Sequence, residues 1–288
     1  MNFDVLFPDE RERGENPLKQ CQLVMLRMLK IFNYLCIKHD IQYFLVGGSL
    51  LGAIRHQGFI PWDDDLDVGM TRKNYKKFVQ LAVPELPNDV FFQTPETDIY
   101  FSSCGRVEAK LKDKFSSYIN SEEKKNQKHH LGLQLDLFVY DKAYFPHNAL
   151  IYAVNRFLVI LFWKIGKNNK GNQKRAKVLQ LISKIPLPFV YASGFILNKR
   201  MIKLGANYIK ENEIVTLVKK PFEDMEVYIP QGWDACLRRQ YGNYMQLPPD
   251  IQQKGLHSAD IPHPFTPCNH TEVLFWENRV IKENNILK

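Results

Sequence analysis

Four aspartates lie within five consecutive positions in the stretch DDDLD. Carboxylates held this close repel one another, so such a group is typical of a site that holds a cation. Asp63, Asp65 and Asp67 have the spacing of the first three ligands of an EF-hand calcium loop. That loop is excluded, since its sixth position is Val68 rather than glycine and its twelfth is Asn74 rather than glutamate.

A magnesium site on a β-strand fits the same residues better. Alternate residues of a strand project side by side, so Asp65 and Asp67 can hold a hard cation and leave coordination places for phosphate. Such a site is typical of phosphoryl transfer, with Mn²⁺ as the alternative ion. Asp136, which faces away from the apolar side of its own strand, is the third candidate. It would ligate the metal or take the proton from an attacking hydroxyl, and both roles stay open.

A glycine-rich turn precedes the aspartates. Gly47 and Gly48 allow the backbone to approach a phosphate closely, and the amides of a helix that starts at Ser49 offer an anion site. Gly-Gly-Ser alone is more often an ordinary turn between a strand and a helix. Because Asp-Leu-Asp follows on the next strand, we interpret these three residues as binding donor phosphates.

The residues around the turn and the acidic stretch are assigned binding, packing or supporting roles. Arg55 and His56 either bind the donor phosphates or the acceptor, or are cations that favour the C-terminal end of a helix. Trp62 is interpreted as a packing residue that fixes the acidic loop. Asp63 and Asp64 are interpreted as a cap and a supporting partner of the metal ligands rather than as ligands themselves.

Periodicity predicts the elements that position these residues. Apolar residues at helical spacing predict a long helix from Pro17 to His39, and Thr71 can cap a further helix that ends before Pro84. A helix from Ser49 to Gly58 would follow the glycine turn. Strands are predicted at residues 42–46, 65–68, 90–94, 105–111 and 131–140, with a polar loop at 121–130.

Composition limits the class of protein. The chain has 288 residues, 45% hydrophobic residues and a net charge of +8, which together predict a globular protein with an anionic partner. Dispersed basic residues without a reader motif argue against nucleic acid as that partner. Five scattered cysteines indicate reduced thiols, and the acidic, proline-containing N-terminal stretch does not resemble a signal peptide. We therefore expect a cytoplasmic protein.

The character of the chain changes after Pro146. Two strongly apolar runs flank a basic stretch, but neither reaches about 18 residues without a charge or proline, so neither is convincing as a membrane span. Residues 147–210 are expected to be a helical subdomain, or helices that lie at a membrane interface. The expected division is a catalytic core at 1–146, this apolar and basic helical insertion, and a C-terminal segment at 211–288 that completes the catalytic domain.

Three segments resemble the LicD family, bacterial phosphocholine transferases whose eukaryotic relatives include fukutin and fukutin-related protein. FLVGGSLLGAIRHQGFIPWDDDLDVGM closely resembles the family signature. LGLQLDLFVYD resembles the middle motif, and PFEDMEVYIPQGWDACLRRQYGNYMQLPP resembles the C-terminal segment. The resemblance implies an α+β fold with a nucleotidyltransferase-like mixed sheet. It assigns metal binding to Asp65 and Asp67, with Asp136 as the third acid, and a basic substrate-binding residue that aligns with either Arg106 or Lys112.

The implied activity is metal-dependent transfer of a phospho-alcohol from a CDP- or CMP-activated donor to a sugar hydroxyl of a glycan, such as lipopolysaccharide, capsular polysaccharide or teichoic acid. Two alternatives stay open: a nucleotidyltransferase that releases pyrophosphate, and an inactive adaptor at a membrane surface. If the acceptor is lipid-linked, the basic apolar region predicts peripheral contact with the cytoplasmic face of the membrane.

Overall fold

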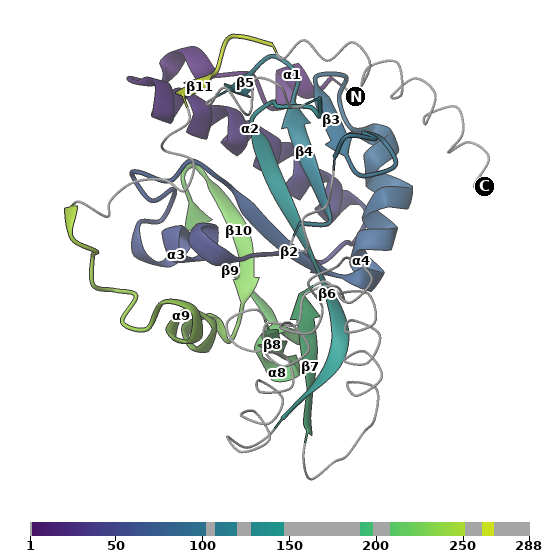
Figure 1. Ribbon diagram of the computed structural model, residues 1–288, viewed down its shortest axis with the longest axis vertical. Helices are drawn as coiled ribbons and strands as arrows, with labels where there is room; N and C mark the ends of the chain where they lie inside the picture. Colours follow the sequence, from purple (N-terminus) through teal and green to yellow (C-terminus); the bar gives the residue numbers. More distant parts are fainter. Residues whose placement is uncertain are drawn as a thin grey trace, which may run out of the picture.

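The protein has an α+β fold built on a seven-stranded mixed sheet (Figure 1). The computed structural model describes residues 2–101, 107–119, 128–146, 191–197, 208–250 and 261–267. The fold class expected from the sequence is confirmed. The strands follow one another across the sheet as β1 (Phe44–Leu45), β2 (Asp67–Thr71), β6 (Gln134–Pro146), β4 (Ala109–Asp113) and β3 (Val90–Gln93), with β7 (Tyr191–Leu197) on β6 and β8 (Tyr208–Lys210) on β7.

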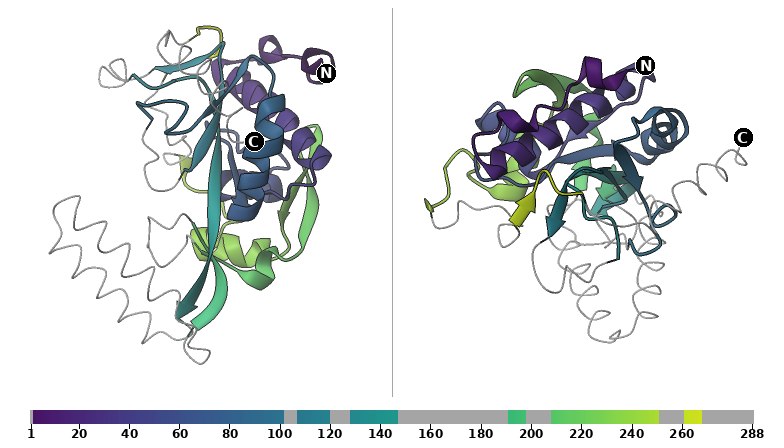
Figure 2. Two further views of the ribbon diagram at one scale, coloured as in Figure 1. Left: turned by 90° about the vertical axis from the view of Figure 1, so that its right-hand side faces the viewer. Right: turned by 90° about the horizontal axis from the view of Figure 1, so that it is seen from above.

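The long helix α2 (Pro17–Lys38) covers one face of the sheet. Asn16 caps it by accepting a hydrogen bond from the backbone of Lys19 at 2.9 Å, and proline occupies its first turn. Its apolar stripe packs against the alternate strand residues that face it, and this forms the main core. Helix α4 (Arg72–Lys77), capped by Thr71, lies on the same side of β6 (Figure 2). Both helices were predicted from the sequence.

The first turn of α3 differs from the prediction. The helix spans Gly47–Arg55, so the two glycines open it rather than precede it, and it ends before Gly58. Gly47 has a φ of +57°, a conformation that favours glycine and lets the chain turn sharply from β1 into the helix. Strand β2 begins only at Asp67, so Asp65 lies in the preceding loop rather than on the strand.

The segment after residue 210 packs onto the first motif. It contains α8 (Glu211–Ile214), the hairpin of β9 (Leu217–Phe222) and β10 (Met225–Pro230), and α9 (Trp233–Tyr241). At the hairpin tip, Glu223 accepts a hydrogen bond from the backbone of Phe59 at 3.0 Å and pairs with Lys19 at 3.1 Å. These contacts fix the loop that leads from α3 to the aspartates.

Parts of the expected helical insertion are strands. Within 147–210 the structure describes β7 and β8, which extend the central sheet, so the helical expectation is wrong for these residues. An apolar run does not by itself distinguish a helix from a buried strand. The remainder of 147–210, like most of the predicted loop at 121–130, lies outside the described residues. Among the helices that are described, none is both long and apolar enough to cross a membrane.

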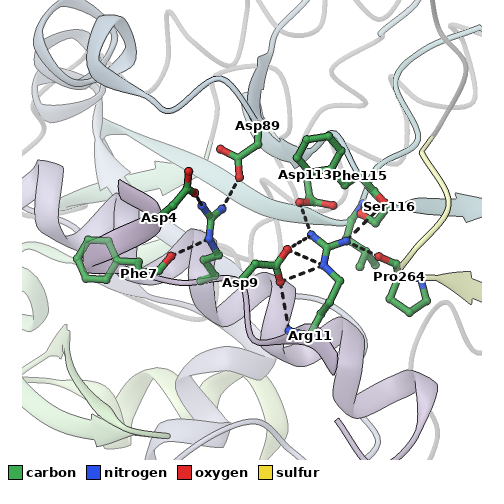
Figure 3. Close-up of polar contacts among 11 residues, drawn as sticks. Asp4, Phe7, Asp9, Arg11, Asp89, Asp113, Phe115, Ser116 and Pro264 are labelled. Atoms are coloured by element: carbon green, nitrogen blue, oxygen red, sulfur yellow. Dashed lines mark hydrogen bonds and ion pairs between the residues drawn. The ribbon is translucent and has the colours of Figure 1, made fainter. Parts of the chain in front are cut away.

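Two arginines fasten the N-terminal elements α1 (Phe3–Leu6) and η1 (Arg11–Arg13) to the sheet (Figure 3). Arg11 is 5% exposed and donates to the Asp113 carboxylate at 2.9 Å and to the carbonyl of Pro264. Arg27 donates to Asp89 at 2.6 Å and also pairs with the α1 segment. Pro264 follows β11 (Ile261–His263), which pairs with β5 (Ser117–Ile119), so one guanidinium joins both ends of the described chain.

Candidate active site

A row of three charged residues crosses the sheet on the face opposite α2. Asp67 on β2 is directly opposite Asp136 on the parallel strand β6, and Asp136 is opposite Lys110 on β4. The Lys110 ammonium lies 3.0 Å from Asp136 Oδ1 and 3.1 Å from Oδ2. Because residues in register on neighbouring strands project from the same face, the three side chains share one surface.

The alternation of β6 explains why Asp136 faces this way. Leu135 and Leu137 are fully buried in the main core, and Val139 is fully buried as well. Side chains of a strand alternate between its faces, so Asp136 must project from the other side. The orientation predicted for Asp136 is therefore confirmed.

The first turn of α3 lies against the aspartates. A Cβ atom added to Gly47 would be 2.9 Å from Asp67 Oδ2, and one added to Gly48 would be 2.9 Å from Asp63 Oδ2. Ser49 Oγ accepts a hydrogen bond from the backbone amide of Asp67 at 2.8 Å. The glycines thus leave room for carboxylates, and the positive end of the helix faces negative charge.

Crowding of like charges changes the titration of this cluster. Burial, followed by the charge of Asp65 and a hydrogen bond to it, raises the pKa of Asp63 to about 8. Burial and the charges of Asp65, Asp136 and Asp63 raise the pKa of Asp67 well above its ordinary value, although Lys110 opposes this shift. A buried carboxylate beside others favours its neutral form unless a cation compensates for it.

The donor atoms of this cluster suit a hard cation. All are carboxylate oxygens, which Mg²⁺ prefers, and the one cation that the described residues place against Asp136 is Lys110. Within the described ranges, however, no three histidine, cysteine, aspartate or glutamate side chains stand together as a ready metal-binding group. The chemistry of Asp65, Asp67 and Asp136 fits the metal, and their side chains would have to converge to hold it.

The neighbouring acidic and aromatic residues divide between the cleft and the interior. Asp63 lines the cleft, whereas Asp64 is buried and accepts a hydrogen bond from the Tyr118 hydroxyl at 3.0 Å. Trp62 also lines the cleft, and its ring meets that of His56 edge to face at 6.2 Å between centroids. Asp64 therefore supports the loop, whereas Asp63 lies beside the candidate ligands Asp65 and Asp67.

The predicted basic residues are placed in different surroundings. Arg55 lines the cleft, donates to His56 Nε2 at 2.9 Å and donates to the carbonyl of Tyr244 at 2.9 Å. His56 supports Arg55 and is not among the cleft-lining residues. Burial lowers the pKa of both side chains. Arg55 is thus a cation held at the cleft by the segment that follows α9.

Lys112 lies on the site face but does not line the cleft. It is 4% exposed and donates to the carbonyl of Gly132 at 2.9 Å and to Gln134 Oε1 at 2.6 Å. Gln134 in turn contacts Asp136 Oδ2 at 3.4 Å. Arg106 lies outside the described residues. The basic residue that meets the aspartates is Lys110, which the sequence interpretation missed although it occurs in both CGRVEAK and KLKDK.

The cleft in front of the row has a volume of about 750 Å³. Its walls include the start of α3 and, packed against that helix, α9 and the residues after it. On that wall Arg239 donates to both carboxylate oxygens of the buried Glu213, at 3.0 and 2.8 Å. Tyr241 lines the cleft at the end of α9. Neither residue was singled out in the sequence, and the only signal for them was their place in the C-terminal family segment.

The fold and the site together define a class of protein. Adjacent aspartates on two parallel strands, beside a helix that opens with glycines, form an arrangement suited to an enzyme that acts on phosphate groups. Comparison with known proteins agrees with this class. Residues 40–156 match the family described as LicD/FKTN/FKRP, nucleotidyltransferase domain.

Individual relatives extend the match along the chain. The lipopolysaccharide cholinephosphotransferase LicD of Haemophilus influenzae is 30% identical over 273 residues, which cover 83% of this chain and 96% of the relative. The human ribitol 5-phosphate transferase FKRP is 60% identical over 45 residues, 16% of this chain and 9% of that protein. An uncharacterized Rickettsia prowazekii protein, RP689, is 44% identical over 70 residues, 24% of this chain and 26% of its own. The chain belongs to the LicD family, and it is a phosphotransferase.

Proposed function

We propose that this enzyme transfers a phospho-alcohol group from a CDP- or CMP-activated donor to a sugar hydroxyl of a cell-surface glycan and releases CMP. The transferred group is phosphocholine or a related phosphoethanolamine, aminoethylphosphonate or polyol phosphate. The observation that carries the proposal is the row of Asp67, Asp136 and Lys110 in register, in a chain related over most of its length to a cholinephosphotransferase.

In the proposed transfer one bond to phosphorus forms and one bond to phosphorus breaks. The acceptor oxygen bonds to the phosphorus that carries the alcohol, and the bond from that phosphorus to the CMP oxygen breaks, so CMP leaves with the electron pair. The hydroxyl proton passes to a base. Asp136 is the candidate base because its carboxylate lies on the site face, lines the cleft and is paired with Lys110. Because Asp136 lines the cleft, its carboxylate is also placed for its second proposed role, as a metal ligand.

Asp65, Asp67 and Asp136 would hold Mg²⁺, or Mn²⁺ in its place. When bound, the ion would neutralise charge on the transferred phosphate and on the leaving group. The chain itself supplies Gly47, Gly48 and Ser49 at the positive end of α3, close to where the donor phosphates would lie. Arg55 lines the same cleft and adds positive charge there, whereas the charge of Arg239 is balanced by Glu213.

The proposal also includes the place in the cell where the enzyme meets its acceptor. We place the enzyme in the cytoplasm, in peripheral contact with the membrane if the acceptor is lipid-linked. The support is the basic and apolar composition of residues 147–190. Sedimentation with anionic liposomes at low salt tests this part, and failure to sediment would remove it without affecting the transfer itself.

The activity is tested by product analysis. Purified enzyme with Mg²⁺ and an acceptor glycan is offered CDP-choline, CDP-ethanolamine, CDP-ribitol, CMP-aminoethylphosphonate or CTP, and CMP and pyrophosphate are quantified. CMP release that depends on acceptor, and is lost in Asp67→Asn while the melting temperature is kept, supports the proposal. Pyrophosphate release from CTP would instead identify a nucleotidyltransferase, the class of enzyme after which the matched domain is named. Absence of both products would favour the adaptor.

A further inference from the structure

Tyr241 occupies a distinctive place between α9 and the aspartates. It is the last residue of α9, a helix that contacts α3. Gly242 follows with a φ of +68°, and its amide donates to the carbonyl of Arg238 at 2.9 Å, which closes the helix. The helix end therefore fixes the backbone from which the Tyr241 side chain extends into the cleft.

The Tyr241 hydroxyl lies beside the carboxylate cluster. A Cβ atom added to Gly47 would be 2.9 Å from Asp67 Oδ2 and 4.0 Å from Tyr241 Oη, so both oxygens flank the same point at the start of α3. A phenol ordinarily keeps its proton at neutral pH, so this hydroxyl is a hydrogen-bond donor beside the cluster.

The partner of this hydroxyl leaves its hydrogen available. Gln240 Nε2 donates to Tyr241 Oη at 3.2 Å, so the phenolic oxygen acts as an acceptor in that contact. Its own hydrogen is then free to be donated to an anion. At the same time Tyr241 lines the cleft and is 42% exposed. Tyr241 thus combines a hydroxyl that can donate at the site with a position on the cleft wall that a ligand can reach.

We propose that Tyr241 contacts the substrate: its hydroxyl donates a hydrogen bond to the phosphate that is transferred, and its ring forms the cleft wall beside that phosphate. This inference rests on the proposed function and names one more residue for it. The phosphate would lie in front of Asp67 and the start of α3, within reach of the hydroxyl. Negative charge on its oxygens grows as the bond to CMP breaks, so the hydrogen bond matters most during the transfer.

The test removes one oxygen atom and keeps the ring. In Tyr241→Phe, kcat for CMP release should fall about 10- to 100-fold, the usual effect of losing one hydrogen bond to a charged group, while KM for the donor changes little. The fall should be the same factor for two donors with different head groups, because the phosphate is common to both. The matched control is Tyr228→Phe, whose ring packs edge to face on Tyr43 at 5.7 Å outside the cleft.

The possible results separate the inference from the proposed function. A lower kcat in Tyr241→Phe, with an unchanged melting temperature and an active Tyr228→Phe, supports the inference. Wild-type kcat in Tyr241→Phe overturns the inference and leaves the proposed function intact. A loss that differs between head groups overturns the phosphate contact. If the wild-type enzyme releases no CMP from any donor, the proposed function fails and the inference fails with it.

Discussion

The crowded carboxylates predict that replacing Asp63 with asparagine stabilises the protein when divalent ions are removed. Asp63 has an ordinary pKa of 3.8 and a folded-state pKa of about 8. For a raised carboxylate pKa, stability is fully present below the unfolded pKa and is lost as pH rises through the folded pKa. Between about pH 4 and pH 8 Asp63 ionises in the unfolded chain but stays protonated in the folded protein, so the fold loses stability increasingly over this range.

The magnitude follows from this shift. Each pH unit between the two pKa values corresponds to about 1.4 kcal/mol, so the loss reaches about 2 kcal/mol at pH 5 and about 4 kcal/mol at pH 7. Asparagine keeps the shape but cannot ionise, so Asp63→Asn should be more stable than the wild type by about these amounts. For a chain of this size the gain at pH 7 corresponds to a melting temperature higher by about 10 °C.

The measurement is urea and thermal unfolding of both proteins in EDTA at steps from pH 5 to pH 8. Asp40→Asn is the matched control, since the Asp40 side chain is fully exposed at 100% and should show no such pH dependence. Addition of Mg²⁺ should stabilise the wild type more than Asp63→Asn, because the cation compensates for the same repulsion. A stability difference that is constant between pH 5 and pH 8 would refute the reasoning.

Three further substitutions test the arrangement. Lys110→Met leaves a buried Asp136 uncompensated, so it should lower the free energy of unfolding of ion-free protein by about 3 kcal/mol and CMP release at least tenfold; normal values would contradict a role for the pair. Gly47→Ala meets a positive φ and Asp67 Oδ2 at 2.9 Å, so unfolding should show a loss of about 1–2 kcal/mol together with reduced turnover. Arg11→Met should cost about 3–5 kcal/mol in urea unfolding with kcat unchanged, whereas a selective loss of kcat would link this cluster to the site.

Local patterns were sufficient to predict part of the fold. The alternation of leucines on both sides of Asp136 determines its face whatever the neighbours of the strand are. The apolar spacing of α2 and the cap at Thr71 also depend only on nearby residues. For the same reason Asp67 and Asp136 could be proposed as neighbours from two short motifs, before their register was known.

The rest depends on contacts between distant segments. Lys110 and Lys112 are two residues apart and share a face of β4, and only the register with β6 decides which of them meets Asp136. Tyr241 reaches Asp67 from more than 170 positions further along the chain, and no local pattern encodes that approach. The start of α3 was misjudged because a glycine with positive φ can open a helix as well as interrupt a strand.

The arginine that joins both ends of the described chain also has a consequence for synthesis. Arg11 and its carbonyl partner Pro264 are 253 positions apart. At ordinary translation rates they leave the ribosome roughly 10 to 50 s apart. During that interval the guanidinium lacks one of its native acceptors, and the nascent N-terminal elements are held less firmly. The segment that contains Arg11 is therefore fully attached to the sheet only late in synthesis. Its last contact forms when β11, the last described strand to be made, has left the ribosome.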